Sequence, residues 1–158
     1  ARQFKTDLSL IKSVIKSNKK RSRLLLDRVS KILKNKIKNK KISFLGVTFK
    51  ANTDDMRESS SLVMIPSLVK KGAKIKYYDP SGYKKDFRKF KNVSYSKTIE
   101  LCCEDSDLII IHTEWNDFKS LNFKTLSRKK NVIIYDMRNI LSADKMRKEK
   151  ISYFGIGR

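Results

Sequence analysis

Residues 42–80 read ISFLGVTFKANTDDMRESSSLVMIPSLVKKGAKIKYYDP, and this stretch decides the fold class. It opens with a short apolar run (42–47), passes through a polar loop into a helical pattern at 60–71, and closes on a second apolar run at 75–78. Gly72 stands where a helix end favours a left-handed residue, and Asp79 followed by proline ends the second run. The stretch therefore predicts a strand, a helix and a second strand in succession.

The same alternation continues to the end of the chain. It predicts further strands at 108–112, 132–135 and 151–154, and helices at 98–103, 118–129 and 143–148. Because parallel strands need crossovers that are usually helices, the alternation indicates an α/β fold. We predict a Rossmann-like, doubly wound, mainly parallel sheet of five or six strands, preceded by an N-terminal helical segment. Ligands of such sheets sit at the carboxyl ends of the strands.

The N-terminal segment has a different pattern. Apolar residues recur at helical spacing from Asp7 to about Leu33, which predicts one long helix, or two helices interrupted near Asn18. A lysine-rich connection follows. We therefore divide the chain near Asn39, into a helical piece over 1–38 and an α/β unit over 39–158.

The strongest compositional deviation is the formal net charge of +22, from 38 Lys and Arg against 16 Asp and Glu. A polyanionic partner would explain it. The lysines are scattered over nearly all polar positions, however, so we interpret the charge as a general lysine bias, with non-specific nucleic-acid attraction as a salt-sensitive by-product.

Simple features of the sequence argue against a membrane-spanning, disulfide-linked, zinc-binding or secreted protein. No apolar run approaches the roughly 20 residues needed to cross a bilayer. The two cysteines are adjacent, which excludes both a disulfide framework and the spaced ligand pairs of a zinc site. The sequence also begins without methionine or a secretory signal. We expect a soluble, cytoplasmic protein without a metal site, or a fragment of a longer chain.

The loop after the first strand is the first candidate site. It has one of the glycines of a G-x-G-x-x-G loop, so a dinucleotide pyrophosphate cannot approach its backbone in the usual way. It offers instead Lys50, Arg57 and a serine-capped helix start, which together suit a smaller anionic group. The alternative is a solvated basic loop.

The ends of two later strands supply the other candidates. Arg138 follows the strand at 132–135, and its planar fork suits a phosphate. The alternative is an ion pair with Asp136 or Asp79. His112 and Trp115 follow the strand at 108–112, and we interpret them as a structural histidine and a packing residue.

Nothing in the sequence forms a catalytic constellation. Cys102 and Cys103 lie among acidic residues, which raise rather than lower a thiol pKa, so we interpret them as structural. Asp54, Asp55 and Glu58 are interpreted as turn and cap residues rather than paired catalytic carboxylates.

Several separated segments resemble one known family. They are LGVTFKANTDDMRESSSLVMIPSLVKKGAKIKYYDP (45–80), HTEWNDF (112–118), DMRNI (136–140) and YFGIGR (153–158), in that order. Residues 41–158 resemble the C-terminal domain of the UDP-glucose/GDP-mannose dehydrogenase family, nearest to its bacterial UDP-glucose 6-dehydrogenases. Upstream, SVIKSNKKRSRLLLDRV (13–29) looks like the end of that family's central helical domain, through which such enzymes dimerise.

The resemblance implies an activity for the longer enzyme. Two hydride transfers to two NAD molecules would convert UDP-glucose to UDP-glucuronate through a thiohemiacetal on a cysteine that this chain lacks. The NAD-binding domain is also outside this sequence, so the chain by itself would be inactive and would hold no catalytic residue.

The resemblance also implies roles for individual residues. Phe49, Lys50 and Arg138 would bind the UDP-sugar, and Arg57 would reach toward the NAD pyrophosphate. The sequence departs from the family pattern at Ala51, at Ser59 with Ser60, and at Met137, which could crowd a ligand near Arg138.

Two other classes of function remain open at the level of the sequence. A nucleic-acid-binding module would bind any duplex tightly, with a steep dependence on salt. A structural or dimerisation piece would instead use the N-terminal helix against a partner.

Overall fold

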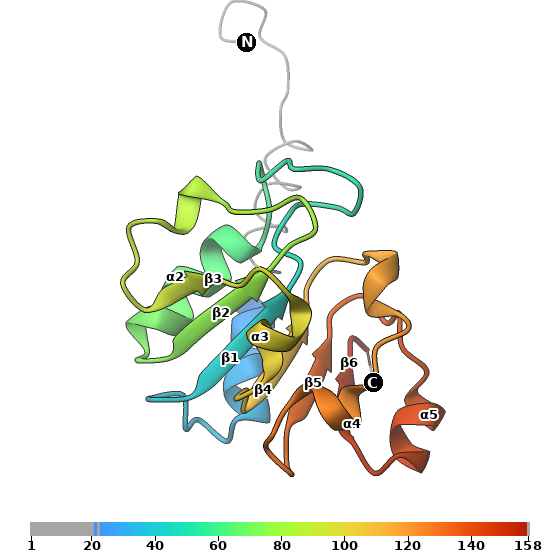
Figure 1. The fold of residues 1–158 in the computed structure, drawn as a ribbon. Coiled ribbons are helices and arrows are strands. Elements are labelled where there is room, and N and C mark those ends of the chain that lie inside the picture. The colour runs from blue at the N-terminus through green and yellow to red at the C-terminus, as the bar shows by residue number, and fades with distance from the viewer. Residues whose placement is uncertain (1–20, 22, 158) are drawn as a thin grey trace, which may run out of the picture.

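The structure is a computed structural model that describes residues 21 and 23–157, and its core is a six-stranded parallel sheet (Figure 1). The strands are β1 (Lys41–Leu45), β2 (Lys74–Tyr78), β3 (Val93–Tyr95), β4 (Leu108–Ile111), β5 (Ile133–Asp136) and β6 (Ser152–Gly155). The helices are residues 23–32, α2 (Ser61–Lys70), α3 (Ile99–Cys103), α4 (Phe123–Leu126) and α5 (Ala143–Lys148), with 3-10 turns η2 (Lys85–Phe87) and η3 (Asn116–Phe118). The predicted fold class is therefore confirmed.

The strand order is β3-β2-β1-β4-β5-β6, so the direction of winding reverses between β1 and β4. In open parallel sheets of this kind, the crevice beyond the carboxyl ends of the two strands at the reversal is where ligands bind. The loops after β1 and β4 are thus the first place to look for a site. Within the described residues, no helix has the length and apolar character needed to cross a membrane.

Alternating strand residues build two cores, one on each face of the sheet. On β1, Ile42 and Phe44 join the cluster under α2 and the helix at 23–32, whereas Leu45 joins the cluster under α3, α4 and α5 (Figure 1). This period-2 alternation is what a strand covered on both sides produces. The central strand β4 is buried along its whole length for the same reason.

The helix at 23–32 packs into the first of these cores. Leu25, Val29 and Leu33 are buried there, and Ile37 follows them. Asn39, where we place the boundary, has a positive φ of 63° and donates its N–H to the carbonyl of Gly72 at 2.8 Å. The division into 1–38 and 39–158 stays a prediction. The helical pattern before residue 21, with its interruption near Asn18, lies outside the described residues.

Two local expectations were wrong. The single helix expected at 118–129 is a 3-10 turn, η3, and the four-residue α4. The apolar residues there, Phe118, Phe123 and Leu126, are all buried, and the Asn122 side chain caps a new helix start by accepting from the N–H of Lys124. These three buried side chains are spaced along the sequence as in one long helix, although two short helical pieces carry them.

The strand β3 was not among the five predicted strands. It has three residues, none fully buried, because it pairs with β2 on one side only and forms the edge of the sheet. The crossover before it contains the 3-10 turn η2 instead of an α-helix. Short edge strands carry too little periodicity to stand out in a sequence.

Candidate functional site

The loop after β1 begins at Gly46, which is in close contact with the end of β4. Gly46 has a φ of +76°, and a Cβ placed there would lie 2.6 Å from the Cβ of Thr113 and 2.8 Å from its Oγ1. The Thr113 hydroxyl donates to the carbonyl of Thr48 at 3.0 Å. Thr113 therefore packs against the Gly46 backbone, and only a glycine fits at this position.

A buried carboxylate at the end of β2 fixes the first residues of this loop. Asp79 is 1% exposed and accepts from the N–H of Val47 at 2.7 Å and of Thr48 at 3.3 Å. Its second oxygen accepts from the N–H of Ser81 at 3.0 Å and from the Ser81 hydroxyl. Since hydrogen bonds to an ionised acceptor are the strong ones, Asp79 holds the loop at the crevice.

The serines at the start of α2 tie the loop from its other end. Ser59 and Ser61 donate to the carbonyl of Val47 at 2.7 and 2.6 Å. Ser60, the N-cap residue, makes no capping hydrogen bond, because its hydroxyl pairs with His112 Nε2 at 2.8 Å. The expected capping by the serine side chain at the helix start is therefore wrong, and anion binding there stays a prediction. These hydroxyls position the loop instead.

His112 is a structural residue, as predicted. It is buried, and its ring nitrogens are paired with Ser60 Oγ and, at 3.1 Å, with Thr113 Oγ1. Burial, together with the nearby charge of Arg138, lowers the pKa of His112 to about 3. The ring is thus neutral near pH 7 and serves as a polar link between α2 and β4.

Arg138, after β5, is joined to the loop after β1. Its Nε donates to the carbonyl of His112 at 2.9 Å, and its Nη2 donates to the carbonyl of Phe49 at 3.2 Å. Its ion-pair partner is Glu114, 2.9 Å from Nε. Neither partner expected from the sequence pairs with this guanidinium: Asp136 accepts from the backbone N–H of Arg138, at 2.9 Å.

The structure thus brings together three of the candidate residues. Arg138 bonds the backbone of Phe49, and Lys50 is the next residue. Phe49 is 49% exposed, and the Lys50 side chain is exposed as well. Met137, which from the sequence could crowd a ligand near Arg138, is buried in the core beneath α2.

Arg57 lies on the same loop, where the carbonyl of Asp55 accepts from the N–H of Phe49 at 2.9 Å, but its guanidinium is paired within the loop. Its guanidinium forms a bidentate pair with Asp55, at 2.9 to 3.2 Å, and its side chain is 89% exposed. The hydrogen bonds from Arg57 lower the pKa of Asp55 to about 2, while the pair raises the pKa of Arg57. Within residues 21 and 23–157, no hydrogen bond joins Arg57 to Lys50 or Arg138.

The remaining candidates are structural. Cys102 and Cys103 are buried, and the hydrogen bond from Cys102 together with burial raises the pKa of the Cys103 thiol. Trp115 packs against the core under α4. In the described part of the chain, no group of histidine, cysteine and carboxylate side chains is arranged to hold a metal ion.

Sequence reasoning missed three residues that shape this edge: Thr113, Glu114 and the loop-holding role of Asp79. The signal for Asp79 was its position, since a carboxylate directly after a buried strand faces the N–H groups of the neighbouring loop. Glu114 and Thr113 gave no such signal, because their partners come from β1 and β5 and only the sheet order makes them neighbours.

Comparisons of the sequence with known proteins identify one family. Residues 43–143 match the family described as "UDP-glucose/GDP-mannose dehydrogenase family, UDP binding domain". The UDP-glucose 6-dehydrogenase of Rickettsia bellii is 38% identical over 154 residues, which are 96% of this chain and 36% of that protein. The chain therefore spans about a third of the length of the curated relatives that it matches.

Solved structures give the same result for the fold. The UDP-glucose dehydrogenase of Pyrobaculum islandicum superposes with a TM-score of 0.74 at 24% identity, covering 97% of this chain and 33% of that one. The UDP-D-ManNAc dehydrogenase of Pyrococcus horikoshii superposes with a TM-score of 0.72 at 27% identity, covering 98% and 35%.

Proposed function

The chain belongs to the UDP-glucose/GDP-mannose dehydrogenase family, of which it contains the UDP binding domain, and we propose that it is the nucleotide-sugar-binding part of an NAD-dependent UDP-glucose 6-dehydrogenase. In this proposal the crevice between β1 and β4 holds the diphosphate of UDP-glucose or of the product UDP-glucuronate. The oxidation of the primary alcohol to a carboxylate belongs to the longer enzyme.

One observation carries the proposal. The Arg138 guanidinium donates to the carbonyl of Phe49 and so reaches the loop that presents Lys50. An arginine that follows β5 thus contacts the loop that carries Lys50, at the edge of the sheet where the strand order reverses. A guanidinium fork and a flexible ammonium group together suit the oxygens of a diphosphate. The exposed ring of Phe49 offers an apolar surface to the base or the sugar.

The loop after β1 has only one of the glycines of a G-x-G-x-x-G loop, which argues against a dinucleotide site in this part of the enzyme. We propose that the dinucleotide is held by the remainder of the longer protein. Arg57 is exposed on the loop and would extend toward its pyrophosphate after exchanging Asp55 for the ligand.

The test uses single substitutions in the complete enzyme. Lys50→Ala and Arg138→Ala should each lower kcat/KM for UDP-glucose by about 10- to 100-fold, since each removes a charge-assisted hydrogen bond of about 1.5–3 kcal/mol. Arg88→Ala changes an exposed arginine next to η2 and serves as the control. Activity that survives both substitutions would refute the site.

Direct binding gives a second measurement. Titration of the chain with UDP-glucose, UDP-glucuronate and unrelated nucleotides at rising salt should show a preference for the uridine nucleotides. A nucleic-acid-binding module would instead bind any duplex, with a steep salt dependence and no such preference. We expect only the non-specific attraction that a charge of +22 produces.

The N-terminal helix is proposed to contribute to a homodimer in the cytoplasm. Sedimentation of the chain with and without its N-terminal residues tests this. The truncation should remove residues 1–20 only, because Val29 and Leu33 belong to the core and a longer deletion would unfold the sheet. A monomer in both forms would contradict the dimer.

A further inference from the structure

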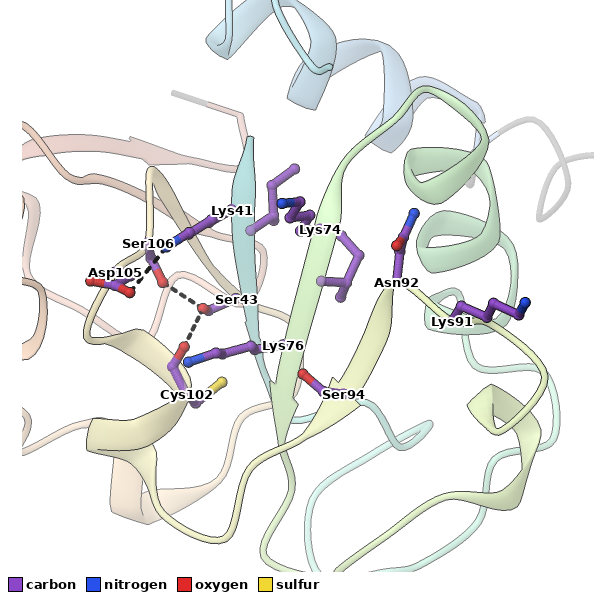
Figure 2. Close-up of a pocket in the computed structure, with 12 residues that line it drawn as sticks. Lys41, Ser43, Lys74, Lys76, Lys91, Asn92, Ser94, Cys102, Asp105 and Ser106 are labelled. Atoms are coloured by element: carbon purple, nitrogen blue, oxygen red, sulfur yellow. Dashed lines mark hydrogen bonds and ion pairs between the residues drawn. The ribbon is translucent and has the colours of Figure 1, made fainter. Parts of the chain in front are cut away.

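A cavity of about 250 Å³ lies at the opposite end of the sheet from the crevice. It opens on the face that carries α3, at the amino ends of β1, β2 and β3 (Figure 2). Along β1 this is roughly 13 Å from the loop that holds Lys50, at 3.3 Å per residue. The cavity is therefore separate from the proposed UDP-sugar site.

The cavity exists because part of this sheet face has no helix over it. The helix α3 packs over β1 and the adjoining side of β2, but in residues 21 and 23–157 no helix covers β3 on this side (Figure 1). The sequence of β2, KIKYY, matches this arrangement. Ile75 faces the core beneath α2, whereas Lys74 and Lys76 face the cavity. An inner strand of a doubly wound sheet is usually apolar on both faces, so lysines here are unusual.

Four lysines line the cavity, and they are of two kinds. Lys41 pairs with Asp105 at 3.0 Å, and Lys76 pairs with Glu104 at 3.3 Å and donates to the carbonyl of Leu101 at 2.9 Å. These contacts turn both ammonium groups toward α3 (Figure 2). For Lys74 and Lys91, by contrast, the described residues supply no hydrogen bond or ion pair to the ammonium group, although both line the cavity.

The neutral polar groups of the cavity divide in the same way. Ser43 donates to the carbonyl of Cys102 at 2.6 Å and bonds Ser106 at 2.5 Å, so these hydroxyls satisfy each other on the α3 side. On the β3 side, the described residues give no side-chain partner to Asn92 or Ser94 (Figure 2). Exposed Lys74, Asn92 and Ser94 thus line the β2–β3 side of the cavity without side-chain partners among the described residues, and Lys91 stands at its rim with its side chain extending outward (Figure 2).

We infer that this cavity is a second anion site, which takes a small phosphate-bearing molecule through Lys74, Lys91, Asn92 and Ser94. Ammonium, amide and hydroxyl donors suit phosphate oxygens. The volume is below the 300–1,000 Å³ usual for cofactor sites, which favours a small phosphate compound over a dinucleotide. The site does not depend on the proposed function, because it shares no residue with the crevice.

Inorganic pyrophosphate is the probe, with sulfate at equal ionic strength as the reference. Calorimetric titration of the Lys50→Ala/Arg138→Ala chain, in which the proposed UDP-sugar site is disabled, should show saturable binding of pyrophosphate. The double variant Lys74→Gln/Lys91→Gln should weaken it by about tenfold or more, since two charge-assisted contacts are lost. The control, Lys145→Gln/Lys148→Gln, removes the same charge from α5 and should leave binding unchanged.

Amide shifts in heteronuclear NMR locate the ligand. Pyrophosphate should move the signals of residues 74–76 and 91–94, and these shifts should persist in Lys50→Ala/Arg138→Ala, whereas shifts at 46–50 would report the proposed UDP-sugar site and should be lost in that variant. Equal weakening by the two double Lys→Gln variants, or displacement by a short DNA duplex, would show a general attraction to the basic surface and overturn the inference. So would binding no tighter than that of sulfate.

Discussion

Replacing Gly46 by alanine should be among the most destabilising small changes available in this chain. The new methyl group would lie 2.6 Å from the Cβ of Thr113, about 1 Å closer than carbon atoms tolerate at rest. Thr113 cannot turn away easily, because its hydroxyl bonds the carbonyl of Thr48 at 3.0 Å and His112 Nδ1 at 3.1 Å. The overlap must therefore be relieved by movement of the backbone.

Two contributions determine the expected loss of unfolding free energy in Gly46→Ala. A non-glycine residue at a φ of +76° costs about 1–2 kcal/mol, and overpacking of a well-packed site costs about 1–3 kcal/mol. The free energy of unfolding should fall by about 2–5 kcal/mol, which in a domain of this size lowers Tm by roughly 10 °C. The loop that carries Lys50 should move as well, so affinity for UDP-glucose should decrease.

Gly82 provides a matched control. Its φ is +88°, but a Cβ placed there meets nothing within 4 Å. Gly82→Ala should therefore cost only the conformational term, about 1–2 kcal/mol. Urea unfolding of both variants, followed by circular dichroism, measures the difference. Equal losses in the two variants would refute the argument that contact with Thr113 makes the glycine necessary.

Three further predictions concern the residues around the crevice. Asp79→Asn should lower the free energy of unfolding by about 1–3 kcal/mol in urea melts, because loop N–H groups lose a charged acceptor; unchanged stability would show that the loop holds itself. The pKa of His112 in the folded chain is about 3, below the ordinary value of 6.5, so the unfolded chain takes up the proton at a higher pH. The free energy of unfolding should therefore fall as the pH drops below 6.5, by up to about 1.4 kcal/mol per pH unit. His112→Asn should flatten that slope between about pH 5 and 6.5 in melts across pH, and an identical slope would contradict the assignment. Glu114→Gln removes the carboxylate paired with Arg138, so calorimetry should show UDP affinity rising by up to about fivefold; weaker binding would mean that Glu114 instead positions the guanidinium.

Much of the fold could be predicted from local patterns. Short β-branched runs such as 108–111 and the alternation in KIKYY depend on which face of a strand is buried, and that information is contained in neighbouring residues. The prediction of secondary structure was wrong where the pattern of apolar residues was compatible with more than one structure. Two short pieces over 116–126 have the same apolar spacing as one helix, and the edge strand β3 is too short and too exposed to have a pattern.

The sequence by itself determined the fold class and which cations stand at strand ends, because both depend on spacing along the chain. Only the tertiary structure decided which of those cations contacts the loop after β1 from another strand. The sheet order places β1 between β2 and β4, so Asp79 and Thr113 reach the same loop from opposite sides, and Arg138 reaches it from β5. Arg57 has the same local signals but is paired with Asp55 two residues away. Which side chains become partners depends on contacts between residues up to 89 positions apart, and a local sequence pattern does not contain that information.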